Sequence, residues 1–244
     1  MSGCIANSEA RALPPGGFAR VAWPAFAALL AAEVAWVADA PAHSPARSLP
    51  AAALVVGLAL LATVAGLARR LPAANAVAAA GTVFGLTTAA LLLGRAGLPL
   101  GPADYPPGLG PRCLGLVPVA FPLAWVGLLL NSRGLARRLV YGARPAVGRG
   151  RLVIGLAVPL TLLGDGLLQH WARAAAGVWG AGTPTGVPLA HYPVAAAFSA
   201  LNLILLTPWL IDKHPSAPRP ADAFPALIWA VLLAGLALAD WAAR

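Results

Sequence analysis

The stretch that decides the fold class reads LVIGLAVPLTLLGDGLLQHW and covers residues 152–171. It contains one acidic residue, Asp165, and neither lysine nor arginine. A helix of roughly 20 mostly apolar residues crosses the hydrocarbon core of a bilayer, which is about 30 Å thick. The stretch therefore predicts a membrane-spanning helix that carries a single carboxyl group.

Six further apolar runs of similar length lie along the chain. They cover residues 21–38, 50–68, 74–94, 113–130, 193–211 and 223–241. The 244 residues are 59% hydrophobic and 10% charged, with a mean hydropathy of +0.77, whereas soluble domains carry about 25% charged residues. This composition excludes a soluble globular enzyme and a disordered chain. It predicts an all-α polytopic membrane bundle of about seven transmembrane helices, forming one integral membrane domain over residues 1–244.

Basic residues set the predicted orientation of the helices. The connection 132–151 contains six arginines and no acid, and basic connections favour the cytoplasmic side. Placing it there leaves twelve of the 17 basic residues inside and five outside. We therefore expect a multi-pass protein of the cell (inner) membrane with a cytoplasmic N-terminus and an external C-terminus. The net charge of +9 follows from this topology, so the lipid bilayer is the expected partner and nucleic acid is not.

Two further predictions concern the tryptophans and the first apolar run, residues 21–38. Trp23, Trp36, Trp171, Trp209 and Trp241 fall near the ends of predicted spans, as expected for an interfacial aromatic belt. Ala38-Asp39-Ala40 resembles the cleavage site of a signal peptide, which would leave six spans. Glu33 inside the run favours a retained helix.

Asp165 and Glu33 are the acids placed deepest in the predicted spans. An ionised carboxylate costs at least about 2.5–3.5 kcal/mol in hydrocarbon, so such groups face the bundle interior and favour the protonated form. Asp165 is a candidate general acid, with a structural hydrogen-bonding role as the alternative; for Glu33 the structural role is favoured. Gln169 lies four residues after Asp165 and is expected to hydrogen-bond to it.

Neither a metal ion nor a cofactor is expected. His170 has no second histidine or acid at metal-ligand spacing on its helix, and Cys4 and Cys113 match no metal or redox motif. Phosphate-binding and dinucleotide-binding motifs are also missing from the sequence.

Two connections rich in proline and glycine, residues 97–111 and 177–192, are predicted to lie on the external side. Their side chains would form a cap over one cavity, with a pair of simple tight connectors as the alternative. The residues expected to line such a cap are Tyr105, Trp179, His191 and Tyr192.

Short motifs in these two connections and in the sequence between them occur in a recognisable order. They are Gly97-Leu-Pro-Leu-Gly101, Tyr105, Leu109-Gly-Pro111, Pro122-Leu-Ala-Trp125, Asp165, Gly177-Val-Trp179 and Gly186-Val-Pro-Leu189. Over residues 95–192 this pattern resembles a family of membrane proteins of carotenoid biosynthesis. Members of that family include hydratases of γ-carotene and bisanhydrobacterioruberin.

The resemblance implies acid-catalysed hydration of a terminal C=C bond of a carotene to a tertiary alcohol. Such a reaction needs a desolvated acid, a slot for an apolar polyene or isoprenoid substrate, and controlled access of water. The candidate catalytic residues are Asp165, His191 and Tyr105, and the candidate substrate-binding residues are Trp125, Trp179, Tyr192 and Gln169.

The chain departs from the family pattern at several polar positions. Ala90 and Leu91 stand where an acid is usual, Gln169-His170 replaces Asp-Pro, Gly164 replaces Trp, and His191 replaces Asn. The missing acids leave two alternatives open: a different transformation of an isoprenoid lipid, or a non-catalytic membrane scaffold of a pigment pathway. A small transporter is a third, favoured by helix-breaking residues around Pro159.

Overall fold

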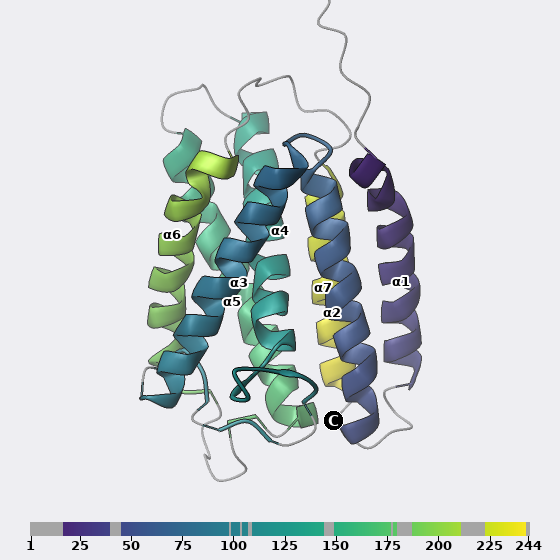
Figure 1. Ribbon diagram of the computed structural model, residues 1–244, viewed down its shortest axis with the longest axis vertical. Coiled ribbons are helices and arrows are strands. Elements are labelled where there is room, and N and C mark those ends of the chain that lie inside the picture. Colours follow the sequence, from purple (N-terminus) through teal and green to yellow (C-terminus); the bar gives the residue numbers. More distant parts are fainter. Residues whose placement is uncertain are drawn as a thin grey trace, which may run out of the picture.

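The computed structural model describes residues 17–39, 45–97, 99–102, 104–106, 109–143, 149–176, 178–179, 187–210 and 223–242. These ranges form seven α-helices that run side by side as one bundle (Figure 1). The helices are α1 (Ala22–Asp39), α2 (Pro45–Leu67), α3 (Ala73–Arg95), α4 (Ala120–Ala143), α5 (Arg149–Ala176), α6 (His191–Leu210) and α7 (Phe224–Ala242). A short 3-10 helix, η1 (Gly17–Val21), precedes α1. The predicted all-α membrane helical bundle is confirmed.

The surface of the bundle suits a lipid environment. Four helical segments are long and apolar enough to cross a membrane, namely Gly17–Ala38, Ala73–Arg95, Arg149–Arg173 and His191–Leu210. Ala51–Leu67 and Phe224–Ala239 are shorter apolar helices. Val34, Leu54, Val77 and Ile204 expose more than half of their surface, which is favourable in lipid and costly in water.

The fourth predicted span, residues 113–130, is wrong at both ends. Arg112–Cys113 (β1) and Val117–Pro118 (β2) form a small antiparallel hairpin whose turn has left-handed backbone at Leu114 (φ 52°) and Gly115 (φ 69°). Because this turn interrupts the apolar run, α4 begins only at Ala120. Its second half contains much of the arginine-rich stretch predicted as a loop, since Ser132, Ala136 and Val140 form a buried stripe at helical spacing.

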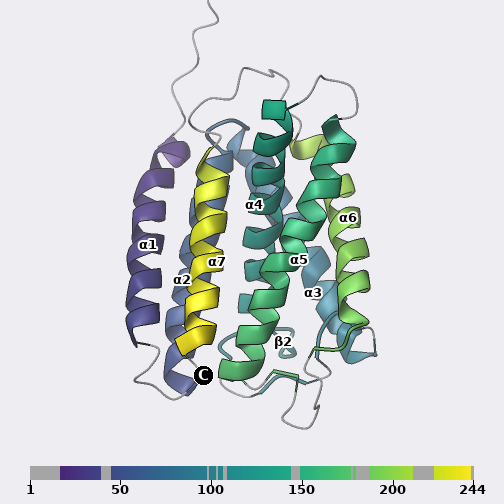
Figure 2. The same cartoon turned by 180° about the vertical axis from the view of Figure 1, so that it is seen from behind.

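The remaining predicted spans coincide with helices, although α2 and α5 are longer than expected. Successive helices alternate in direction, so the basic ends of α2 and α4 and the start of α5 lie at the upper end in Figures 1 and 2. The C-terminal ends of α3 and α5 and the β1–β2 hairpin lie at the opposite end. The assignment of the basic end to the cytoplasm stays a prediction.

Helix α4 lies inside the bundle and packs against α2, α3, α5 and α7. Side-chain hydrogen bonds, one buried and one partly buried, reinforce two of these contacts. Asn131 donates to Thr63 Oγ1 of α2 at 2.7 Å, and the Trp229 indole of α7 donates to Ser132 Oγ at 3.0 Å. Hydrogen bonds between membrane helices contribute roughly 0.6–2 kcal/mol each, so these polar contacts help to fix α4 against its neighbours.

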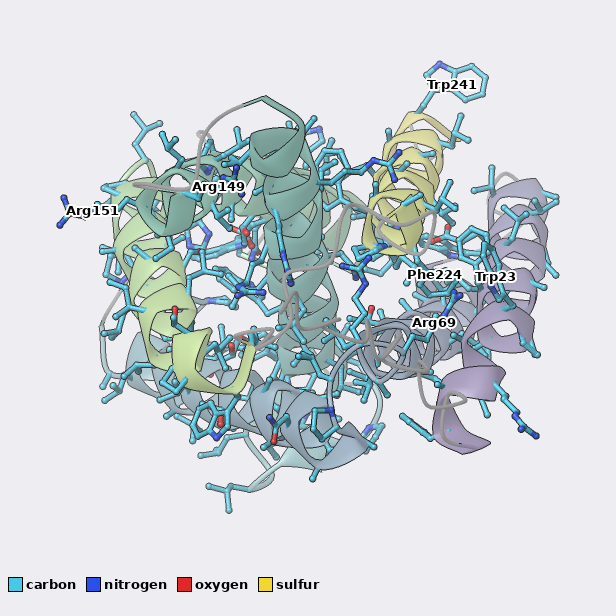
Figure 3. All side chains as sticks on the ribbon, turned by 90° about the horizontal axis from the view of Figure 1, so that it is seen from above. Trp23, Arg69, Arg149, Arg151, Phe224 and Trp241 are labelled. Atoms are coloured by element: carbon cyan, nitrogen blue, oxygen red, sulfur yellow. The ribbon has the colours of Figure 1, made fainter. Side chains whose placement is uncertain are left out.

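A cluster of aromatic rings around Arg69 joins α1, α2 and α7 at the basic end (Figure 3). The guanidinium carbon of Arg69 lies 5.6 Å from the ring centroid of Trp23 and 5.7 Å from that of Phe224. The two rings contact each other edge to face, with centroids 5.0 Å apart. These cation–π contacts stabilise the corner where α2 ends.

Candidate active site

A buried carboxyl–imidazole pair joins α5 to the first residue of α6. Asp165 Oδ2 lies 2.6 Å from His191 Nε2, and neither side chain exposes any surface. His191 Nδ1 lies 3.0 Å from the carbonyl oxygen of Pro99. Because a carbonyl oxygen can only accept, Nδ1 carries a hydrogen, and because two bare acceptors would repel at 2.6 Å, either Nε2 or Oδ2 carries one further proton. The pair is neutral overall whichever atom holds that proton, so its burial is tolerated.

Gln169 links this pair to Trp179. The indole N–H of Trp179 donates to Gln169 Oε1 at 2.9 Å, and Gln169 Nε2 donates to Asp165 Oδ1 at 3.0 Å. The hydrogen bond expected between Gln169 and Asp165 is therefore present. An indole can only donate, which fixes the orientation of the Gln169 amide, and both oxygens of Asp165 have partners. We call Asp165, His191, Gln169 and Trp179 the Asp165 network.

Local backbone structure positions the network. His191 and Tyr192 begin α6 through backbone hydrogen bonds to Pro188 and Leu189, at 2.9 and 3.3 Å. Trp179 has a left-handed backbone (φ 78°), a conformation that is unfavourable for a bulky residue. Its indole hydrogen bond helps to hold it there, so side-chain pairing compensates for backbone strain.

Two aromatic rings enclose the imidazole. The ring centroid of His191 lies 5.6 Å from that of Trp179 and 5.5 Å from that of Tyr192, both edge to face. The Tyr192 ring also lies close to Gly166 of α5. Of the predicted site residues, the structure thus brings together Asp165, Gln169, Trp179, His191 and Tyr192.

Tyr105 and Trp125 are separate from this network within the described residues. Tyr105 packs on Phe121 with ring centroids 5.4 Å apart, and its buried hydroxyl has no hydrogen-bond partner in the part of the chain that the structure describes. Burial raises the pKa of Tyr105, and the positive charge of Arg95 partly opposes this shift. Trp125 packs edge to face on Phe198 of α6, at 5.6 Å.

An apolar cavity of about 390 Å³ lies between α2, α4, α5 and the segment Leu109–Pro111. Leu168, three residues after Asp165, forms part of its wall together with Trp171 and Phe121. A narrower cavity of about 50 Å³ shares Leu168 and Trp171 and extends to Glu33. The cavities therefore lie against the same helix as the Asp165 network.

Sequence reasoning assigned two of the cavity residues to the wrong environment. Trp36 and Trp171 were expected at the membrane interface, but they are buried and pack edge to face, with centroids 5.4 Å apart. Trp23, Trp209 and Trp241 are exposed, as an aromatic belt requires. All five tryptophans were predicted from their position near the end of a span. That position does not show whether a side chain faces the lipid or the interior of the bundle.

Three of the departures from the family pattern, Gln169, His191 and Gly164, lie in the Asp165 network or next to it in the chain. Gln169 and His191 both contact Asp165 directly. A β-carbon at Gly164 would lie 2.6 Å from Leu128 Cδ2 of α4, so this packing leaves no room for a larger side chain. Cys4, Gly177 and Gly186 lie outside the described residues. Among the residues described, no cluster of three or more His, Cys, Asp or Glu could hold a metal ion.

The model of one family, described as carotenoid biosynthesis protein, matches residues 49–242. The chain belongs to this family. The match is wider than the motif region 95–192 and includes the whole Asp165 network, whereas α1 and Glu33 precede it. No curated protein and no solved structure matches the chain. Family membership supports a role in carotenoid biosynthesis.

Proposed function

We propose that this carotenoid biosynthesis protein hydrates a terminal C=C bond of a carotene to a tertiary alcohol. The observation that carries the proposal is the 2.6 Å contact between Asp165 Oδ2 and His191 Nε2 in a fully buried pair. A buried pair that holds one transferable proton is the kind of group that protonation of an alkene requires.

In the proposed reaction the proton of this pair adds to the less substituted carbon of the double bond. The π electrons form the new C–H bond and leave a tertiary carbocation. The oxygen of a water molecule then bonds to that carbon, and the proton which this water releases returns to the Asp165–His191 pair. The pair is regenerated, and the net change is the addition of one water molecule.

Two features of the surroundings support these steps. The wall of the 390 Å³ cavity is apolar and includes Leu168, one helical turn from Asp165, as a polyene substrate would need. Trp179 and Tyr192 present aromatic rings beside His191, and such rings stabilise a nearby cation. We propose that Trp125 serves the same substrate on the α4 side. We propose that Tyr105, whose hydroxyl has no partner among the described residues, positions the water.

The decisive experiment replaces the proton donor and keeps the hydrogen bonds. In Asp165→Asn the amide oxygen still accepts from Gln169 and the amide nitrogen donates to His191 Nε2. Expressed in a host that accumulates lycopene or γ-carotene, the native chain is expected to yield a more polar hydroxylated pigment, and Asp165→Asn is expected to yield at least a hundredfold less. Glu33→Gln is the matched control, since it removes the other buried acid and should leave hydration intact.

Full hydration activity in Asp165→Asn would overturn the assignment of the acid. Unchanged pigment with the native chain, when it is normally inserted in the membrane, would instead favour the second candidate function. That candidate is a non-catalytic membrane scaffold of the pathway. The complete pairing of both Asp165 oxygens favours it, because a satisfied network also stabilises a fold without chemistry.

We also propose that the arginine-rich end of the bundle is cytoplasmic in the inner membrane. Cys113 lies in β1, beyond the opposite ends of the helices, and is free and partly exposed. In a Cys4→Ser background, a membrane-impermeant maleimide is expected to label Cys113 in spheroplasts. Arg138→Cys, combined with Cys4→Ser and Cys113→Ser, should be labelled only after lysis. The reverse pattern would invert the topology.

A further inference from the structure

Glu33 is a buried carboxyl group that the proposed hydration does not use. Its side chain on α1 is 4% exposed, and within the described ranges its Oε2 atom has no hydrogen-bond partner. Gly235 of α7 lies so close that a β-carbon there would collide with the carboxyl group. A buried polar atom without a partner destabilises a protein, so a molecule that supplied the missing partner would be bound favourably.

The surroundings of Glu33 are suited to a long apolar molecule. Glu33 lines the narrow cavity between α1, α2, α4, α5 and α7, whose other wall residues are apolar or aromatic. Five wall residues also belong to the 390 Å³ cavity, which reaches Leu109–Pro111 in the connection after α3. Those shared residues are Ala52, Val56, Ala124, Leu168 and Trp171. The two cavities are therefore adjacent, and we call them together the apolar passage; Glu33 lines its narrower part.

We propose that this passage binds an isoprenoid that ends in a hydroxyl group. The hydroxyl hydrogen-bonds to Glu33 and the hydrocarbon chain extends along the shared wall toward Leu109. A hydroxyl can donate to the carboxyl group in either protonation state. A pure hydrocarbon would leave Glu33 unpaired, and an amine would require an ionised carboxylate inside a span, which is costly.

The inference rests on the proposed function for the isoprenoid nature of the ligand, because hydration of a carotene yields such an alcohol. It adds Glu33 as a polar anchor at the narrow end of the cavity proposed for the polyene, on a helix that precedes the matched residues 49–242. Binding at Glu33 involves no chemical step, so the two proposals can fail independently.

The test measures equilibrium binding of two matched probes to the full-length protein in lipid nanodiscs. The probes are retinol, a polyene alcohol, and its deoxy hydrocarbon, with energy transfer from Trp36 and Trp171 as the signal. The native protein is expected to bind retinol about five- to tenfold more tightly than the hydrocarbon, as one hydrogen bond allows. Glu33→Leu should bind both probes equally, and Glu33→Gln should keep the preference because an amide oxygen also accepts.

Equal affinities in the native protein, or a preference that survives in Glu33→Leu, would overturn the proposal. A second variant, Ala52→Phe, obstructs the wall shared by both cavities and is expected to weaken binding of both probes at least tenfold; unchanged binding there would also overturn it. Should Glu33→Leu fail to fold, the native comparison and Ala52→Phe still decide. Asp165→Asn should retain the preference for retinol, so loss of hydration and loss of this site give different results.

Discussion

Asp165 and Glu33 are two buried carboxyl groups in one bundle with opposite surroundings. Asp165, between α5 and α6, has one oxygen bonded to Gln169 and the other to His191. Glu33, between α1 and α7, has an oxygen without a partner in the described part of the chain. Both are nearly or completely buried. Burial is therefore common to the two acids, and the hydrogen-bond partners that the fold supplies distinguish them.

The largest loss of stability is expected when Asp165 is replaced. Asp165→Ala should lower the free energy of unfolding by about 3–5 kcal/mol, because it leaves His191 and Gln169 buried without their partner. Glu33→Leu should change it by less than about 1 kcal/mol, since no hydrogen bond recorded among the described residues is lost and an oxygen without a partner there is removed. Denaturant or thermal unfolding in detergent, followed by tryptophan fluorescence, measures both.

His191→Ala serves as the internal control for this prediction. If the pair acts as one unit, Asp165→Ala and His191→Ala should be strongly non-additive when combined. Equal losses of stability in Asp165→Ala and Glu33→Leu would contradict the distinction drawn between the two acids.

Features that depend on local sequence could be predicted, whereas features that depend on backbone turns or on the packing of distant residues could not. Apolar length predicts the helices well, since a span needs a fixed number of residues. The fourth span was misplaced because the turn at Leu114 and Gly115 is encoded by backbone conformation rather than hydropathy. Gln169 was predictable as a partner of Asp165 from helical spacing. The bond to His191 was not, because it joins residues 26 positions apart through the packing of α6.

Two glycines next to the acids allow a sharper test of packing. Gly164→Ala should destabilise the protein by about 1–3 kcal/mol, because the new methyl group meets Leu128 in a tightly packed interface. Gly235→Ala should cost less, since the group it meets is the end of the Glu33 side chain, which has the neighbouring cavity to move into. Unfolding measurements on both variants compare the two sites directly.

Leu128→Ala provides the rescue for the first variant. Combined with Gly164→Ala it should be less destabilising than the sum of the two single changes, because the collision is removed. A simple sum would show that Gly164 is not required for the close approach of α4 and α5.

A smaller loss of stability is expected at Trp179, the residue of the Asp165 network whose indole bonds to Gln169. Trp179→Phe removes the indole donor and leaves Gln169 Oε1 unpaired, which should cost about 1–2 kcal/mol. Trp36→Phe, beside Glu33, removes no hydrogen bond that the structure records and should cost less. Hydration by Trp179→Phe should fall as well, because Gln169 no longer orients Asp165; an unchanged rate with lowered stability would make Trp179 purely structural.

The smallest loss of stability is expected at Arg69, where α1, α2 and α7 meet. Arg69→Ala removes the cation between Trp23 and Phe224 and should lower the free energy of unfolding by about 0.5–2 kcal/mol, while Arg69→Lys should retain part of that stability. Because the described contacts of Arg69 share no residue with the Asp165 network, Arg69→Ala and Asp165→Ala should be additive within about 0.5 kcal/mol. Strong coupling between them, measured by unfolding of the double variant, would show that the α1–α2–α7 side and the Asp165 side unfold as one tightly linked unit. The contrast between the two acids would then reflect their position in a shared core as much as their hydrogen-bond partners.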